Sequence, residues 1–110
     1  ELKKRCDLAY ITMHEEILNK EQAERDKLAT IEVNERLEMD RIQKEYQHFI
    51  NSKGRSSQTE EGAAKLIQLE TAKAQAMAKS RLARQAAERQ KIKVKEAQEA
   101  LEAAIKSIQG

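Results

Sequence analysis

The sequence contains no proline, no tryptophan and only three glycines, so little in it would interrupt a helix. Aromatic residues make up 3% of the 110 residues and charged residues 36%, whereas charged residues are about a quarter of an ordinary globular domain. A chain this short and polar has room for one domain at most and cannot build a thick core. Its apolar residues, 39% of the total, recur at regular spacing, which disordered chains lack. The composition therefore predicts an all-α protein of long helices or a coiled coil.

The sequence also has little with which to build a reactive site. His14 and His48 stand far apart, and Cys6 is the single cysteine, so neither an intrachain disulfide nor the spacing of a zinc site is present. No phosphate-binding glycine loop of the GxxxxGK[ST] type occurs. We therefore expect no catalytic activity, no metal and no cofactor. Cys6 is interpreted as a small apolar residue of a helix stripe, with an interchain disulfide or a reactive thiol as the alternative.

Membrane-spanning and secretory signals are missing as well. No apolar run approaches the ~18–20 residues needed to cross a bilayer, and no signal-peptide pattern occurs. Because the chain starts at Glu1 without an initiator methionine, we expect an excerpt of a longer protein. We expect that protein to be intracellular and cytoplasmic.

An apolar stripe with an 11-residue repeat runs through residues 1–50. Its steps cycle mostly through 4, 3 and 4 residues, which corresponds to 3.67 residues per turn, close to a straight α-helix. Such a stripe is typical of one long amphipathic helix. Lys20, Glu24 and Glu35 interrupt it. The members expected at a helix–helix interface are Cys6, Met13, Ile17, Leu28, Ile31, Met39, Ile42, Tyr46 and Ile50.

A second pattern runs through residues 63–110, where steps of 3 and 4 alternate without a fault. This is the heptad pattern of a coiled coil. Lys73, Ser80 and Gln90 interrupt it, and its middle is rich in alanine, so another helix can approach closely there. The polar residues in both stripes either lie at partly solvated edges of the helix–helix contact or fix the register of the two helices. The apolar members expected at the interface are Leu66, Leu69, Ala76, Ala83, Ala87, Val94, Ala97, Leu101, Ala104 and Ile108.

Residues 51–62 separate the two helices. Gly54 can take the left-handed conformation that ends a helix. Ser57 and Glu60 have the spacing of a capping box, in which the serine hydroxyl and the glutamate carboxylate satisfy backbone N–H groups. We therefore expect a turn here. A second interpretation makes the turn a docking tip formed by Phe49, Lys53 and Arg55, against the simpler one of a solvated connector.

The charges of the two helices favour an antiparallel hairpin. Residues 1–50 hold nine basic and twelve acidic residues, a net charge of −3, and residues 63–110 hold ten and five, a net charge of +5. If position i faces position 111 − i, Ile17 meets Val94, and Lys20 falls beside Gln90. The alternative is a continuous or kinked helix that pairs with a second chain.

The predicted function rests on the apolar residues that the hairpin does not cover. Nine apolar residues lie outside both seams and predict a second interface, such as a homodimeric four-helix assembly. They are Leu18, Val33, Leu37, Phe49, Ile67, Met77, Leu82, Ile92 and Ile105. The pattern predicts a coiled-coil scaffold, stalk or oligomerisation module whose partners are proteins, including itself.

The alternative function is binding of a polyanion, either nucleic acid or an anionic membrane surface, by the basic second helix. The basic residues spread around the helix and lack aromatic stacking platforms, which weighs against this alternative. The residues that would make the contacts are Arg81, Arg84, Arg89, Lys91, Lys93 and Lys95.

Overall fold

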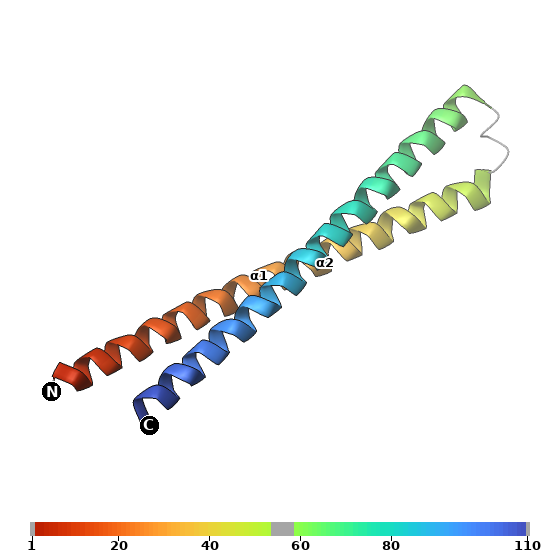
Figure 1. Cartoon of the computed structure of the whole chain (residues 1–110). Coiled ribbons are helices and arrows are strands. Elements are labelled where there is room, and N and C mark those ends of the chain that lie inside the picture. The colour runs from red at the N-terminus through yellow and green to blue at the C-terminus, as the bar shows by residue number, and fades with distance from the viewer. Residues whose placement is uncertain (1, 54–58, 110) are drawn as a thin grey trace. The chain divides into compact units, whose positions relative to one another are not determined.

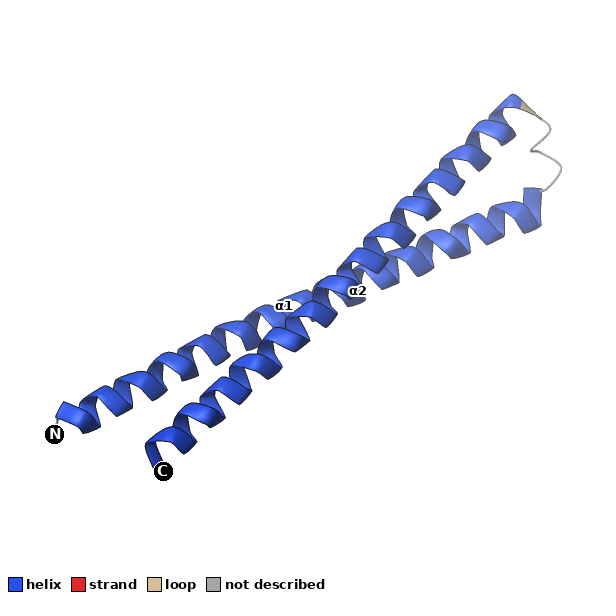
Figure 2. Ribbon diagram, viewed as in Figure 1, coloured by secondary structure: helices blue, strands red, loops and turns tan. Residues whose placement is uncertain are grey.

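The protein is all-α and consists of two long helices. The computed structural model describes residues 2–53 and 59–109, and every one of these except Thr59 is helical. Helix α1 spans Leu2–Lys53 and helix α2 spans Glu60–Gln109 (Figures 1 and 2). No strand occurs within these two ranges. Both helices extend slightly further into the 51–62 segment than the sequence pattern predicts.

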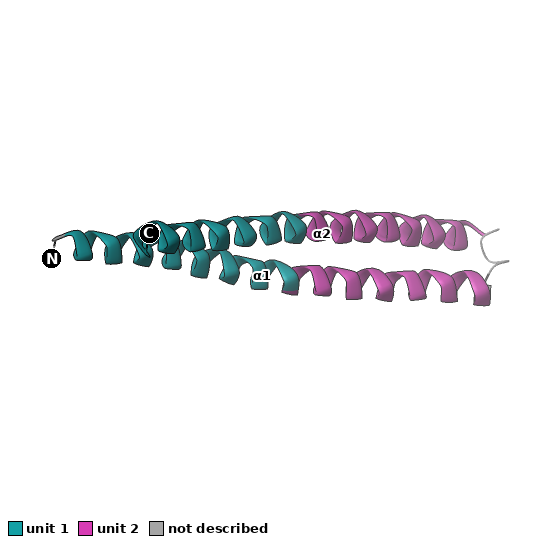
Figure 3. Cartoon of the chain, turned by 60° about the horizontal axis from the view of Figure 1, so that its bottom comes forward, with its two compact units in different colours: residues 1–29, 86–110 teal, residues 30–85 magenta. Residues whose placement is uncertain are grey.

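The chain divides into two compact units, which Figure 3 colours separately. Unit 1 pairs the N-terminal part of α1, Glu1–Ala29, with the C-terminal part of α2, Ala86–Gly110. Unit 2 covers Thr30–Gln85 and contains the remainder of both helices. Within each unit the two helix segments run antiparallel (Figure 1). The predicted antiparallel helical hairpin is therefore confirmed, and the alternative of one continuous helix is not what forms.

Helix α2 begins with a threonine cap. The Thr59 hydroxyl accepts a hydrogen bond from the Gly62 N–H at 3.0 Å, and the Thr59 carbonyl accepts one from the Ala63 N–H at 2.9 Å. The two acidic residues that follow Thr59 lie in the first turn, where the helix dipole favours negative charge. The expected capping residue Ser57 and the expected terminator Gly54 lie outside the described residues. The cap that the structure shows is Thr59.

The core lies on one face of α2. Every buried residue in the described part of the chain belongs to this helix, and the buried side chains all fall on its heptad positions. The remaining interface members expected on this helix, Leu66, Ala83, Ala97, Leu101 and Ile108, are partly buried. The buried side chains are Leu69, Ala76, Ala87, Gln90, Val94 and Ala104.

The face of α1 that packs against α2 differs from the stripe expected from the sequence. Its partly buried residues repeat at steps of 3 and 4, the same heptad period as α2. The reason is that two helices can stay in contact over many turns only when both present a 3.5-residue repeat to each other. The residues of this face are Asp7, Ile11, His14, Leu18, Glu21, Arg25, Leu28, Glu32, Glu35, Met39, Ile42, Tyr46 and Phe49.

The expected stripe and the observed face therefore agree only in part. Leu28, Met39, Ile42 and Tyr46 belong to both, and Ile50 is partly buried beside them. Towards the N-terminus the contact moves by one residue, so that Leu18 and His14 take the places expected for Ile17 and Met13. Four residues that we expected at the interface are exposed: Cys6, Met13 at 45%, Ile17 at 44% and Ile31 at 39%.

Candidate interaction surfaces

A second apolar seam lies on α1 in unit 1. Cys6, Tyr10, Met13 and Ile17 follow one another at steps of 4, 3 and 4 residues, and all four are exposed. Each immediately precedes a residue of the face that packs on α2, so this seam lies about 100° around the helix from that face. Its period is that of a coiled-coil contact. We call these four residues the outer seam.

Tyr10 of the outer seam contacts His14, a residue of the α1 face that packs on α2. The ring of Tyr10 packs edge-on against the ring of His14, with centroids 4.7 Å apart and planes at 85°. This is a favourable aromatic geometry. The Nε2 atom of His14 is buried and has no hydrogen-bond partner among the described residues. The tyrosine ring is therefore held by its neighbour even though 48% of Tyr10 is exposed.

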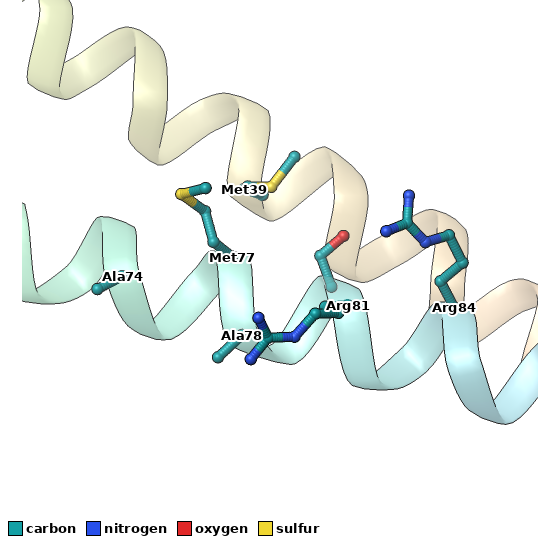
Figure 4. A pocket seen from close by; sticks show the side chains of 7 residues that line it. Met39, Ala74, Met77, Ala78, Arg81 and Arg84 are labelled. Carbon is teal, nitrogen blue, oxygen red and sulfur yellow. The ribbon is translucent and has the colours of Figure 1, made fainter.

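Unit 2 contains an open groove of about 440 Å³. Figure 4 shows Met39 reaching into it from α1 and Met77 from α2, with Arg81 and Arg84 further along α2. The groove exists because the other lining residues are small and leave space beside Met39. Those residues are Ala74, Ala78 and Ser80. We call this site the Met–Arg groove.

Arg41 of α1 pairs with two glutamates of its own helix. Arg41 donates to Glu38 at 3.1 Å and to Glu45 at 3.3 Å. The hydrogen bond from Arg41 lowers the pKa of Glu38, and the charge of Lys79 on α2 lowers it further. The same bond raises the pKa of Arg41. Glu38 and Glu45 are thus committed to an arginine of their own helix.

The basic residues of α2 are mostly left unpaired. Within the described part of the chain, Arg81 and Arg84 make no ion pair or hydrogen bond and are exposed, whereas Lys91 pairs with Glu88 at 3.2 Å. Arg89, Lys93 and Lys95 are exposed too. Helical spacing puts Lys91 and Lys95 on one side of α2 and Arg89 and Lys93 on another. No single basic stripe therefore forms among these four residues of unit 1.

Polar residues also bridge the helices inside each unit. In unit 1 the side-chain amide of Gln90 donates to the Glu21 carbonyl at 2.9 Å and to its carboxylate at 2.8 Å. Their numbers add to 111, which is the expected register, although the expected neighbour of Gln90 was Lys20. In unit 2 the Lys73 ammonium lies 4.7 Å from the centre of the Tyr46 ring.

The structure describes only part of the possible docking tip. Phe49 is partly buried, while Arg55 and the side chain of Lys53 lie outside what the structure describes. No group of three or more potential metal ligands occurs among the described residues. Neither described helix has a stretch long and apolar enough to cross a membrane.

No protein-family model matches the chain, and no curated protein or solved structure matches it either.

Proposed function

We propose that the chain is a non-catalytic coiled-coil module that works through protein–protein contacts, as a scaffold, stalk or oligomerisation element. The observation that carries this proposal is the outer seam, which has coiled-coil spacing and is not covered by α2. The exposed thiol of Cys6 suits a reducing compartment such as the cytoplasm.

The small core of the hairpin supports the proposal. The buried apolar residues are only Leu69, Val94 and three alanines, and no large side chain is fully buried among the described residues. Two helices that bury so little gain stability from any partner that binds only the folded state. A module of this kind is therefore expected to function in an assembly.

A second copy of the chain is the partner that the outer seam fits. If two copies pair antiparallel about the middle of the seam, Cys6 of one copy meets Ile17 of the other, and Tyr10 meets Met13. The first pair joins a small side chain to a large one, and the second brings a thioether to an aromatic ring, which is a favourable contact. An interface that uses one patch twice is the usual geometry of a homodimer.

The exposed area indicates how strong this homodimer is. Tyr10, Met13 and Ile17 each expose a little under half of their surface, or roughly 100 Å² apiece. The seam therefore offers about 300 Å² per copy, while a standard interface buries about 800 Å² per partner. We expect a weak dimer that forms at high protein concentration, unless segments outside the described residues add to the contact.

Sedimentation equilibrium over a wide concentration range tests this proposal. Ile17→Glu is expected to abolish the dimer, because it places a charge in the outer seam. Ile31→Glu is the matched control, since Ile31 is an isoleucine of the same helix, 39% exposed and outside the outer seam. A wild-type chain that stays monomeric at every concentration contradicts self-association, and equal effects of the two variants contradict the seam.

The alternative function, polyanion binding by α2, is favoured by the unpaired arginines and lysines of that helix. Binding to phosphate groups weakens steeply with salt. Retention on heparin or duplex DNA that is strong at about 50 mM salt and lost at about 200 mM would support this alternative. Weak retention at the lower concentration would exclude it.

A further inference from the structure

We propose that the Met–Arg groove of unit 2 is a docking site for an acidic amphipathic helix of a partner protein. This inference rests on the proposed function, because it assigns a partner class to a module that works through protein contacts. It concerns a different surface from the outer seam, so the two can be tested separately.

The lining residues of α2 already have the spacing that a docked helix needs. Ala74, Met77, Arg81 and Arg84 follow one another at steps of 3, 4 and 3 residues and form one continuous stripe. A partner helix lying along this stripe presents residues at the same steps. An apolar side chain opposite Met77 is then accompanied by residues 4 and 7 positions away, opposite Arg81 and Arg84.

The apolar end of the groove suits a branched or aromatic side chain of the partner. Met77 is 51% exposed and Met39 is partly buried, so both thioether side chains line the opening. Methionine has an unbranched, polarisable side chain that adapts to different apolar shapes. The small residues around it allow the backbone of a partner helix to come close.

The charged end of the groove determines that the partner is acidic. The guanidinium groups of Arg81 and Arg84 lie three residues apart on α2, and neither makes an ion pair or hydrogen bond with the described residues. The nearby acidic side chain of Glu38 is bonded to Arg41. Arginine binds carboxylates through paired hydrogen bonds, which gives both affinity and orientation. Two acidic residues on the partner would match these two groups.

A fluorescently labelled helical peptide is the probe. Its central leucine is flanked on both sides by glutamates 4 and 7 residues away, so it matches the stripe whichever way it runs. Anisotropy of this peptide with the full chain should show saturable binding, and the double variant Arg81→Glu, Arg84→Glu should weaken it about tenfold or more. A peptide with lysines in place of the glutamates should bind this double variant better than it binds the wild-type chain.

The double variant Arg89→Glu, Lys95→Glu is the matched control, because it makes the same change of charge in unit 1, away from the groove. Absence of binding by the wild-type chain overturns the inference, as does an equal loss in both double variants. Displacement of the peptide by duplex DNA together with equal losses would assign these residues to polyanion binding instead. Sedimentation of the Arg81→Glu, Arg84→Glu chain separates the two proposals, since the homodimer depends on Ile17 and not on this groove.

Discussion

The hydrogen bonds between Gln90 and Glu21 are the clearest test of how the two helices keep their register. Gln90 is the only buried polar side chain among the described residues, at 5% exposure. Its amide donates to both the backbone and the carboxylate of Glu21. Ala87 and Val94, the nearest buried residues of the α2 seam, offer no other polar group.

The size of the effect follows from these contacts. A hydrogen bond to a charged group contributes about 1.5–3 kcal/mol, and removing the side chain also loses packing. Gln90→Ala should therefore lower the free energy of unfolding by about 2–4 kcal/mol, or the melting temperature by roughly 10–20 °C for a chain of this size. Gln90→Leu keeps the volume and adds apolar burial, while half-buried Glu21 can turn to water. The free energy of unfolding of Gln90→Leu should lie within about 1 kcal/mol of the wild-type value.

Circular dichroism at increasing temperature measures both variants, with Gln98→Ala as the control, because Gln98 is an exposed glutamine of the same helix. A double-mutant cycle with Glu21→Ala should give a coupling energy of about 1–2 kcal/mol. Spin labels that report the distance between the helices should show a broader distribution in Gln90→Leu, because the apolar seam alone tolerates sliding. An unchanged melting temperature in Gln90→Ala, or a coupling energy near zero, would refute the reasoning.

Three further predictions concern other polar contacts. His14→Leu should raise the melting temperature, because it removes a buried nitrogen without a partner, which costs about 1–3 kcal/mol; a lower melting temperature would contradict this. Tyr46→Leu should destabilise the wild type by about 0.5–1 kcal/mol more than it destabilises a Lys73→Met variant, because that variant has already lost the contact between the Lys73 ammonium and the Tyr46 ring. Chemical denaturation measures the difference, and equal losses of stability in the two backgrounds would contradict the prediction. The pKa of Glu38 should rise in Arg41→Ala, as NMR titration of the carboxyl group can show. Because folding lowers this pKa, the stabilising contribution of Glu38 is present above its ordinary value of 4.5 and is lost as the pH falls through the folded value; an unchanged pKa would contradict the assignment.

The heptad pattern of α2 could be predicted residue by residue because nothing competes with it. Its seam has a single period, and the same residues pack in the structure. Helix α1 could be predicted as a helix, but its packed face only towards the C-terminus, where Leu28, Met39, Ile42 and Tyr46 are partly buried as expected. Six residues of its packed face are charged or histidine, among them Glu21 and Arg25, so hydrophobicity alone does not reveal which face meets α2. The threonine cap was missed because Ser57 offers the better sequence match, whereas the cap lies two residues later at Thr59 and the helix begins at Glu60.

The Met–Arg groove could not be found from a periodic pattern on one helix. Met39 belongs to the stripe of α1, and Met77, Arg81 and Arg84 were noted only as residues outside the seam or as basic residues. Their meeting depends on the antiparallel register within unit 2, which sets Met39 beside the small residues of α2. Of the small lining residues only Ser80 belongs to the α2 seam, whose small middle residues predict the close approach of another helix.

The 11-residue repeat of α1 explains why this helix has two apolar faces. On a helix packed at 3.5 residues per turn, each step of 11 residues moves the stripe about 50° around the axis. Starting from Met39 in the interface, the first step towards the N-terminus reaches Leu28, which is still partly buried, and the second reaches Ile17, which is exposed. A third step reaches Cys6, further round on the outer seam.

One regular stripe therefore packs against α2 over the C-terminal part of α1 and turns away from α2 in unit 1. A helix that needed only α2 as its partner would have kept its apolar residues on the heptad face, where Glu21 and Arg25 now stand. The repeat thus favours a second contact for the N-terminal part of α1.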